Sequence, residues 1–326
     1  MKYLETGSTD PEFNLALEQH VFDTLSLEDE FFMLWQNSDA VIVGLHQNTA
    51  EEINREYVER RRISVVRRCS GGGAVFHDLH GINFTFVTRA SGLGFDMSDS
   101  CRPILDAVLS LGVSAEFSGR NDMTIGGRKF SGGASYLRDG RLLYHGTLLF
   151  DADFEKMSAA LRPPEDKIVS KGVKSIRGRV TNIREHLPRD MTVTEFWEHL
   201  RRNVARNMPA HTLMERDLDA ANKIRSERYG TWEWNFGRSP DYGIKKRRYI
   251  PGFGAIRVSM EVQEGRIAAF KTDGDYFGVR TCNDVAAALL GVKPDAAALR
   301  DALAAIPLGE YYSGLARDDF IRIILE

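Results

Sequence analysis

The sequence predicts an α+β protein with one large domain and a smaller second one. Segments with strand character outnumber helical ones up to residue 150, and the stretch from Met123 to Phe150 has the pattern of an antiparallel meander. Beyond residue 150 the pattern is mostly helical, and strands return only after residue 250. A chain of 326 residues is long enough for two domains of unequal size.

Local chemistry places the elements of the first half. Asp10 followed by Pro11 is a typical helix start, and Gly112 is a typical helix end. Helices are expected at 11–25, 50–61 and 103–111. Runs of β-branched and aromatic residues predict strands at 31–35, 40–45, 63–68, 74–78, 82–87, 113–117 and 122–125.

Two turns bound the middle strand of the predicted meander. Gly126-Gly127 precedes this strand and Asp139-Gly140 follows it, and both pairs are typical of tight hairpin turns. Lys129 is therefore expected on the middle strand, close after a turn.

The second half is expected to begin with helices and to end in a small domain. The helices are predicted at 154–161 and 193–207, and the basic stretch 167–184 between them is expected to be a loop. An aromatic stretch at 232–237 precedes the polar residues 238–248, which are interpreted as a hinge between domains. In the small domain, strands are expected at 256–262 and 267–272, and helices at 283–290 and 296–305.

Composition narrows the classes of partner and compartment. A net charge of −3 argues against a protein that holds nucleic acid by bulk electrostatics, so small molecules or proteins are the expected partners. Cys69, Cys101 and Cys282 are far apart, which fits neither a disulfide framework nor a zinc site and suits a reducing compartment. No signal peptide and no membrane span are recognisable, and the expected location is the cytoplasm.

A triple-glycine run, Gly71-Gly72-Gly73, lies between two predicted strands and suggests a phosphate site. Glycine lets backbone N–H groups approach an anion, while Arg67 and Arg68 bring charge and Ser70 a hydroxyl. A Walker loop is excluded, because no Lys-Ser or Lys-Thr pair and no helix follow the glycines. A glycine-rich hairpin with a bulge remains an alternative.

Lys129 is the strongest candidate for catalysis. A lysine at this place can bring its ammonium to the point where a carboxylate and a phosphate meet, although a strand lysine is usually a solvated surface residue. Asn121 and Asp122 come shortly before it and could bind an adenine edge or hydrated Mg²⁺, or could simply form a turn.

Three further side chains are open to two interpretations. His145 and His77 are each either a polar group near the site or a hydrogen-bonded core histidine. Cys69 lies beside the glycine run, but with no recognisable base nearby it is expected to be a small buried thiol and not a nucleophile.

Several strings together resemble the signature segments of the lipoate–protein ligase family. They are residues 65–78 (VVRRCSGGGAVFHD), 119–122 (GRND), 128–132 (RKFSG) and 145–149 (HGTLL), and the match extends to 41–48 (VIVGLHQN) and 171–182 (KGVKSIRGRVTN). The resemblance spans about residues 10–240, and the remainder is similar to the long, two-domain form of the ligase.

The resemblance implies a fold and a domain division. The fold is that of the biotin/lipoate ligases, which is class II synthetase-like, with a central mixed sheet flanked by helices and a small C-terminal α/β accessory domain. The implied domains are a catalytic domain over 1–240 and an accessory domain over 246–326.

The resemblance also implies a two-step reaction. The lipoate carboxylate attacks MgATP to give lipoyl-AMP, and a lysine of an apo lipoyl domain then takes the lipoyl group as an amide. The implied acceptors are the E2 subunits of 2-oxoacid dehydrogenase complexes and the glycine cleavage H protein, and the implied cofactors are ATP and Mg²⁺.

The resemblance also implies roles for the residues that stand at the positions of the family motifs. Lys129 is expected to be catalytic and to contact both the nucleotide and lipoate. The other expected nucleotide contacts are Arg68, Ser70, Gly72, Gly73, Ala74, Val75, Phe76, Asn121 and Asp122. Expected lipoate contacts are Val75, Phe76 and His145, with Leu17 as a further apolar candidate, and Asp122 is the candidate metal ligand. The loop 167–184 resembles the family segment that covers the adenylate.

The chain departs from the family pattern at two places. Leu45 stands where a basic residue is common, which leaves the preferred acyl chain open, and His80-Gly81 replaces the usual Gly-Asn. An ATP-independent octanoyl or lipoyl transferase of the same fold is an alternative, but no cysteine stands in a segment similar to that nucleophile. A non-catalytic factor that binds lipoyl domains is a further alternative.

Overall fold

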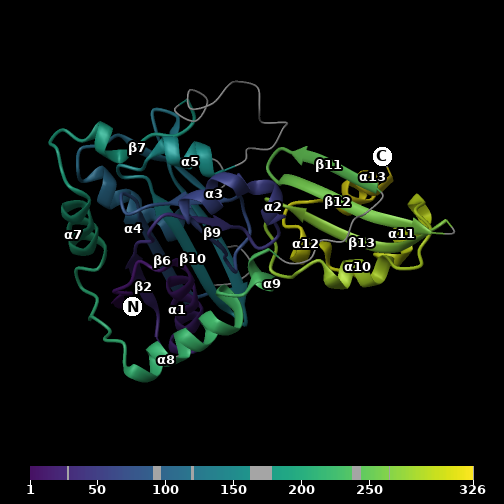
Figure 1. Cartoon of the computed structure of the whole chain (residues 1–326), viewed down its shortest axis with the longest axis horizontal. Helices are drawn as coiled ribbons and strands as arrows, with labels where there is room; N and C mark the ends of the chain where they lie inside the picture. Colours follow the sequence, from purple (N-terminus) through teal and green to yellow (C-terminus); the bar gives the residue numbers. More distant parts are fainter. Residues whose placement is uncertain are drawn as a thin grey trace. The chain divides into compact units, whose positions relative to one another are not determined.

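The protein is described by a computed structural model that covers residues 1–27, 29–90, 97–118, 121–161, 178–236, 244–263 and 265–325. The chain divides into two compact units (Figure 1). The first unit contains Met1–Val43, Thr49–Cys69 and Val75–Phe236. The second contains the described chain from Ile244 onward together with two short upstream segments, Gly44–Asn48 and Ser70–Ala74.

The first unit combines strands and helices along its whole length. Its strands are β1 Lys2–Glu5, β2 Phe31–Trp35, β3 Ala40–Val43, β4 Ser64–Arg67, β5 Val75–His77, β6 Ile82–Arg89, β7 Ala115–Ser118, β8 Asp122–Ile125, β9 Arg128–Arg138 and β10 Arg141–Leu148. Its helices are α1 Pro11–Asp23, α2 Thr49–Glu52, α3 Arg55–Arg61, α4 Met97–Leu109, α5 Phe154–Ala160, α7 Val193–Val204, α8 Glu215–Ile224 and α9 Trp232–Asn235.

A seven-stranded mixed sheet forms the centre of this unit. The strand order is β1-β2-β6-β10-β9-β8-β7, in which β1 and β2 are parallel and all other neighbours are antiparallel. The predicted meander is confirmed as β8-β9-β10, and Lys129 lies on its middle strand. The glycines of the first turn, Gly126 and Gly127, both have positive φ, the conformation that glycine adopts without a steric penalty.

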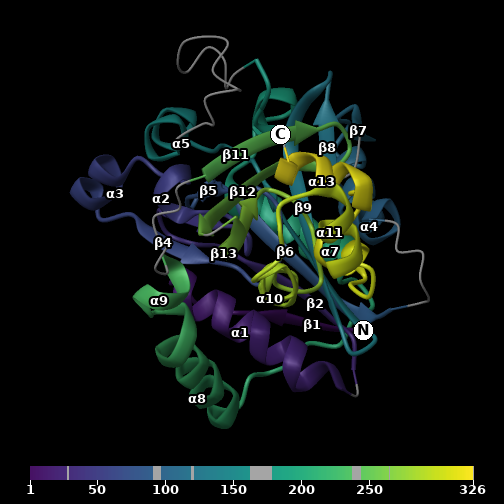
Figure 2. The ribbon, with the colours of Figure 1, turned by 90° about the vertical axis from the view of Figure 1, so that its right-hand side faces the viewer.

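Helices cover both faces of the sheet, which explains why β2 is apolar at every position. Phe31, Met33 and Trp35 pack into a core shared with α1, whereas Phe32 and Leu34 pack into a core shared with α4 and α7. Helices α1 and α8 lie side by side, as both views show (Figures 1 and 2). The predicted fold, a mixed sheet flanked by helices, is confirmed.

A second sheet of this unit, β4-β3-β5, corrects one alternative. Strand β3 pairs with β4 in parallel and with β5 in antiparallel orientation, so β4 and β5 lie on opposite sides of β3. The interpretation of the glycine run as the turn of a β4–β5 hairpin is therefore wrong, and the run is a crossover between strands that do not pair.

Three predicted elements differ from the structure. The helix expected at 50–61 is two helices, since Ile53 forms an isolated bridge and the Asn54 side chain caps α3. Pro103 lies inside α4 and does not start it. Part of the predicted hinge 238–248 is a strand, β11, which begins at Ile244.

The second unit is a small α/β structure. Its antiparallel sheet consists of β11 Ile244–Ile250, β12 Gly254–Gln263 and β13 Arg266–Gly274. Its helices are α10 Asn283–Leu289, α11 Ala296–Ala302, α12 Leu308–Tyr311 and α13 Arg317–Leu325. Residues of the sheet such as Val258 and Phe270 share one apolar core with residues of the helices such as Leu299 and Phe320.

Across the described ranges, no helix combines the length and the apolar character that crossing a bilayer requires.

Candidate active site

Lys129 is the second residue of β9 and forms an ion pair across to β8. Its Nζ lies 2.7 Å from Oδ1 of Asp122, and the two side chains are 38% and 35% exposed. The pair is therefore half-buried, which distinguishes Lys129 from a fully solvated surface lysine.

The backbone of Lys129 is also held. Its N–H donates to the carbonyl of Arg179 (2.8 Å), and its carbonyl accepts from the N–H of Thr181 (2.9 Å). The described end of the basic stretch thus runs beside β9 at the lysine. The rest of the predicted covering loop, up to residue 177, lies outside the described residues.

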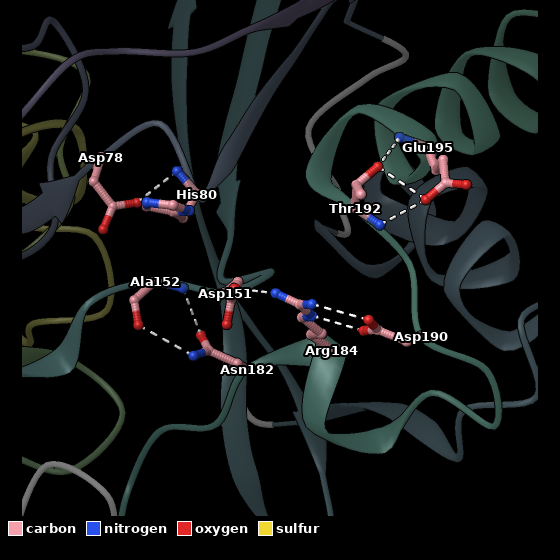
Figure 3. A network of polar contacts seen from close by, with 9 residues as sticks. All are labelled: Asp78, His80, Asp151, Ala152, Asn182, Arg184, Asp190, Thr192 and Glu195. Atoms are coloured by element: carbon pink, nitrogen blue, oxygen red, sulfur yellow. Dashed lines mark hydrogen bonds and ion pairs between the residues drawn. The ribbon is translucent and has the colours of Figure 1, made fainter.

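A polar network anchors the chain just after this contact (Figure 3). Asn182 exchanges two hydrogen bonds with the backbone of Ala152, at 3.0 and 3.1 Å. Arg184 donates to Asp151 (2.6 Å) and to both carboxylate oxygens of Asp190 (2.8 and 3.0 Å). These contacts fix the segment that binds the backbone of Lys129.

His145, on β10, is buried and bonded to an acid that the sequence analysis did not single out. Its Nδ1 lies 2.9 and 3.1 Å from the two carboxylate oxygens of Glu18 on α1. Glu18 is 1% exposed and also accepts from the hydroxyl of Thr85 (2.6 Å), which in turn accepts from the indole N–H of Trp35 (3.0 Å). A carboxylate in the core is thus satisfied by two donors.

His77 lies in a directional chain of hydrogen bonds. Oδ1 of Asn37 accepts from the amide of Asn14 (2.9 Å), so the NH2 group of Asn37 faces His77 and can only donate. Nδ1 of His77 therefore accepts (3.0 Å), and its Nε2–H donates to the hydroxyl of Thr147 (2.8 Å). That hydroxyl then donates to Asn83 (2.9 Å). Burial, with smaller contributions from the nearby charges of Arg68 and His145, lowers the pKa of His77 from 6.5 to about 3.

The two arginines before the glycine run have different surroundings. Arg67 donates to the carbonyl of Trp234 (2.9 Å) and to the hydroxyl of Thr49 (2.7 Å), so its guanidinium ties β4 to neighbouring segments. The expectation that Arg67 serves an anion is not supported by this arrangement. Arg68 is buried and donates to the carbonyl of Ile42 (3.2 Å). Burial lowers the pKa of Arg68 to about 10, so the side chain remains cationic at neutral pH.

The glycine run belongs to the second unit and packs against its backbone there. The N–H of Gly72 donates to the carbonyl of Tyr276 (3.3 Å), and a Cβ on Gly71 would lie 2.6 Å from the same oxygen. Gly73 has ordinary room, and the carbonyl of Ser70 accepts from the N–H of Leu45 (2.8 Å), which joins the two short segments of this unit.

The structure also gives the surroundings of the other residues that were expected to contact the nucleotide or lipoate. Asn121 donates its side-chain amide to the carbonyl of Gly133 (2.6 Å) and so is bound to β9. Ala74 and Val75 are half-buried, whereas Phe76 and Leu17 are buried in the first unit. Gly119 and Arg120 lie outside the described residues.

The first unit brings Lys129, His145 and His77 to one face of the central sheet. A Cβ on Gly132 would lie 2.5 Å from Nζ of Lys129, and Gly132 is the cross-strand partner of Thr147, so both point to the same side. Thr147 binds His77, and His145 is two residues earlier on the same strand. The face therefore presents a half-exposed ammonium beside buried polar groups.

Sequence reasoning missed Glu18 and Gly132. A signal for Glu18 existed, because it lies between Leu17 and Val21 in the buried stripe of α1, where an acid is unusual. No local signal distinguished Gly132 from its neighbour Gly133.

Family comparisons give the class of the protein. Residues 10–205 match the lipoyl protein ligase A/B catalytic domain, and residues 239–324 match the bacterial lipoate protein ligase C-terminus. The chain belongs to the lipoate–protein ligase family, and the family and enzyme class expected from its motifs are confirmed.

Individual relatives agree with this class. The chain is 40% identical over 321 residues to the lipoate-protein ligase LplJ of Bacillus subtilis (strain 168), covering 97% of each chain. A bi-partite lipoate protein ligase from Thermoplasma acidophilum, described with its E2 lipoyl domain, has a TM-score of 0.64 at 28% identity, covering 74% of this chain and 98% of that one. A lipoate-protein ligase A bound with ATP has a TM-score of 0.61 at 27% identity, covering 72% and 98%.

Proposed function

We propose that this ligase activates lipoate with ATP and transfers the lipoyl group to a lysine of an apo lipoyl domain. The acceptors would be E2 subunits of 2-oxoacid dehydrogenase complexes or the glycine cleavage H protein. The observation that carries the proposal is the position of the Lys129 ammonium, half-exposed beside Asp122 on the polar face of the central sheet. An ATP-bound ligase and a ligase described with an E2 lipoyl domain among the similar structures support the substrates.

In the first step a lipoate carboxylate oxygen attacks the α-phosphorus of ATP. The bond from that phosphorus to the bridging oxygen of the β-phosphate breaks, and pyrophosphate leaves. Negative charge on the phosphate oxygens in the transition state is stabilised by the ammonium of Lys129, which acts as a fixed charge and not as a base.

In the second step the neutral amine of the acceptor lysine attacks the carbonyl of lipoyl-AMP. The C–O bond to AMP breaks, an amide forms, and the attacking nitrogen loses a proton. Lys129 stabilises the oxyanion of the tetrahedral intermediate in the same way.

The other candidate residues bind and orient in this proposal. Arg68 contributes a positive charge near the nucleotide, and Ser70, Gly73 and Ala74 offer backbone and hydroxyl groups to its phosphates. The predicted contact of Gly72 would need its N–H to leave the carbonyl of Tyr276, to which it donates in this structure. In this proposal Val75, Phe76 and His145 contact the acyl chain, and the bond to Glu18 holds His145 in place.

Asp122 is the residue that would hold Mg²⁺. No group of three His, Cys, Asp or Glu side chains within the described ranges could hold a metal ion by itself. Mg²⁺ in nucleotide sites is usually held by one or two carboxylates together with nucleotide phosphates, so a single carboxylate is enough for this role. When bound, the ion would neutralise phosphate charge.

The domain division is part of the proposal. We assign the catalytic role to 1–240 and an accessory role to 246–326, and the two family matches, over 10–205 and 239–324, support this division. The two compact units differ from it in that Gly44–Asn48 and Ser70–Ala74 belong to the second unit.

The transferase alternative requires a reactive cysteine. Cys69 and Cys101 are buried, and burial raises the pKa of the Cys69 thiol well above its ordinary value, which disfavours the nucleophilic thiolate. Cys282 is half-buried in the second unit. The cysteines therefore favour the ligase over the transferase.

The test is lipoate-dependent release of pyrophosphate from MgATP, followed in the same tube by mass spectrometry of an added apo lipoyl domain. The ligase should release pyrophosphate and add one lipoyl group to the domain, and Lys129→Ala should lower the rate by about 10²–10³ with an unchanged circular dichroism spectrum. Acyl transfer only from a pre-acylated protein, without pyrophosphate, would support the transferase. Binding of the domain with neither reaction would support the non-catalytic factor.

A further inference from the structure

The end of the Lys129 side chain occupies the space where residue 132 would carry a Cβ. A Cβ on Gly132 would lie 2.5 Å from Nζ and 2.6 Å from Cε of Lys129, and 3.5 Å from Oδ1 of Asp122. Atoms at such distances overlap, so any other residue type at 132 displaces the ammonium.

A β-bulge explains how Lys129 reaches this space. Residues three apart on a regular strand point to opposite faces of the sheet. Here Thr124 pairs with Lys129 but Met123 pairs with Ser131, so β9 contains one extra residue, Phe130, relative to β8. The extra residue reverses the alternation and turns Lys129 to the face of Gly132.

Asp122 completes the arrangement from the neighbouring strand. It is the register partner of Gly132, so its carboxylate starts directly opposite the glycine. The Lys129 side chain folds over the glycine and meets this carboxylate at 2.7 Å. Its backbone is fixed at the same time by Arg179 and Thr181.

We propose that Asp122 and Gly132 are positioning residues for Lys129: the carboxylate and the missing Cβ together hold its ammonium at one point on the polar face. This proposal rests on the proposed function in that Lys129 is the group that contacts the reacting atoms. An ammonium that is already in place does not have to be ordered when the substrates bind, and small displacements of such a group reduce catalysis strongly.

The ion pair between Lys129 and Asp122 adds little to the stability of the fold. Ion pairs at this exposure contribute little to folding, because solvent screens them. The chain offers a matched pair for comparison, Lys156 and Asp39, which lie 3.0 Å apart and are 44% and 39% exposed. The same substitution in this pair removes an equivalent contact away from Lys129.

The first experiment measures the position of the lysine without any substrate. The whole protein is treated with a small amine-acetylating reagent, and the acetylation rates of Lys129 and Lys156 are followed by mass spectrometry. In Asp122→Asn and in Gly132→Ala, Lys129 should react severalfold faster and Lys156 at the wild-type rate. Asp39→Asn should accelerate only Lys156.

The second experiment measures catalysis. Both Asp122→Asn and Gly132→Ala should lower kcat for pyrophosphate release by about 10- to 100-fold with little change in KM, and Asp122→Glu should recover part of the loss. Gly132→Ala should fold normally, because the displaced atoms are the flexible end of a lysine. Thermal melting of each variant checks this.

Unchanged acetylation of Lys129 in both variants would overturn the proposal. So would an Asp122→Asn defect that saturating Mg²⁺ restores while Gly132→Ala has wild-type kcat, because Asp122 would then act through the metal alone. Acetylation requires no reaction, so it decides whether the lysine is held even if wild-type protein releases no pyrophosphate, an outcome that would reject the proposed function separately.

Discussion

Acid should destabilise the first unit through His77. This side chain is 5% exposed and is satisfied in its neutral form, in which Nδ1 accepts from Asn37 and Nε2–H donates to Thr147. A proton on Nδ1 would face the Asn37 amide, itself a donor. Burial accordingly lowers the pKa of His77 to about 3 in the folded protein.

The sign of the effect follows from proton linkage. The folded pKa lies below the unfolded value of 6.5, so the unfolded chain binds more protons between these two values. The contribution of His77 is complete above about pH 6.5 and is lost as the pH falls toward 3. The full shift corresponds to about 5 kcal/mol, at 1.36 kcal/mol for each pKa unit. Acidification from pH 7 to pH 5 should remove about 2 kcal/mol of this.

Urea unfolding followed by tryptophan fluorescence measures this loss. All four tryptophans, at positions 35, 197, 232 and 234, belong to the first unit, so the signal reports on that unit. Between pH 7 and pH 5 the wild type should lose about 2 kcal/mol more than His77→Gln, which cannot titrate. His80→Gln replaces an exposed histidine nearby and should behave as the wild type.

A second measurement covers the case in which His77→Gln fails to fold. The imidazole resonances of His77 in the wild-type protein should show a neutral ring down to pH 5. A ring that becomes protonated above pH 5, or equal losses in the wild type and His77→Gln, would refute the reasoning from burial.

Three further predictions concern stability. Gly133→Ala should cost about 1–3 kcal/mol, because a Cβ there would lie 2.2 Å from the buried Tyr144 hydroxyl; thermal melts should show the loss in this variant and not in Gly132→Ala. Glu18→Ala removes the acceptor for His145 and Thr85 and should cost about 1–3 kcal/mol for each orphaned donor, whereas Glu18→Gln should cost less in urea unfolding. Thr192→Ala removes the capping box of α7 and should cost about 1 kcal/mol, visible as a lower urea midpoint.

The sequence predicted the structure correctly where residues close together in the chain determine it. Asp10 accepts from two N–H groups at the start of α1, and the two turn pairs bound β9 as expected. The prediction from local sequence was wrong at β11, because its charged residues Lys245, Lys246, Arg247 and Arg248 were interpreted as part of a polar hinge. Strand β11 is an edge strand, where charged side chains are compatible with a strand and discourage pairing with other chains.

The candidate site could be predicted from the sequence less completely than the fold. Motifs placed Lys129 on its strand, but the residues that surround its face come from distant parts of the chain. Glu18 and His145 are 127 positions apart, and their contact depends on α1 packing on the sheet. The bulge at Phe130 depends on the register of β8, and that register is set by tertiary pairing and not by the sequence of β9 alone.

The adjacent glycines Gly132 and Gly133 show why a motif alone cannot assign roles. Successive residues on a strand point to opposite faces, so the same missing Cβ makes room for Lys129 on one side and for Tyr144 on the other. The first neighbour is a flexible, half-exposed ammonium, whereas the second is a rigid ring in the core. Adding one methyl group should therefore displace a charge at Gly132 and strain the fold at Gly133. The two adjacent glycines thus meet different requirements, a structural one at Gly133 and, under the proposed function, a catalytic one at Gly132, and only the register of β9 determines which is which.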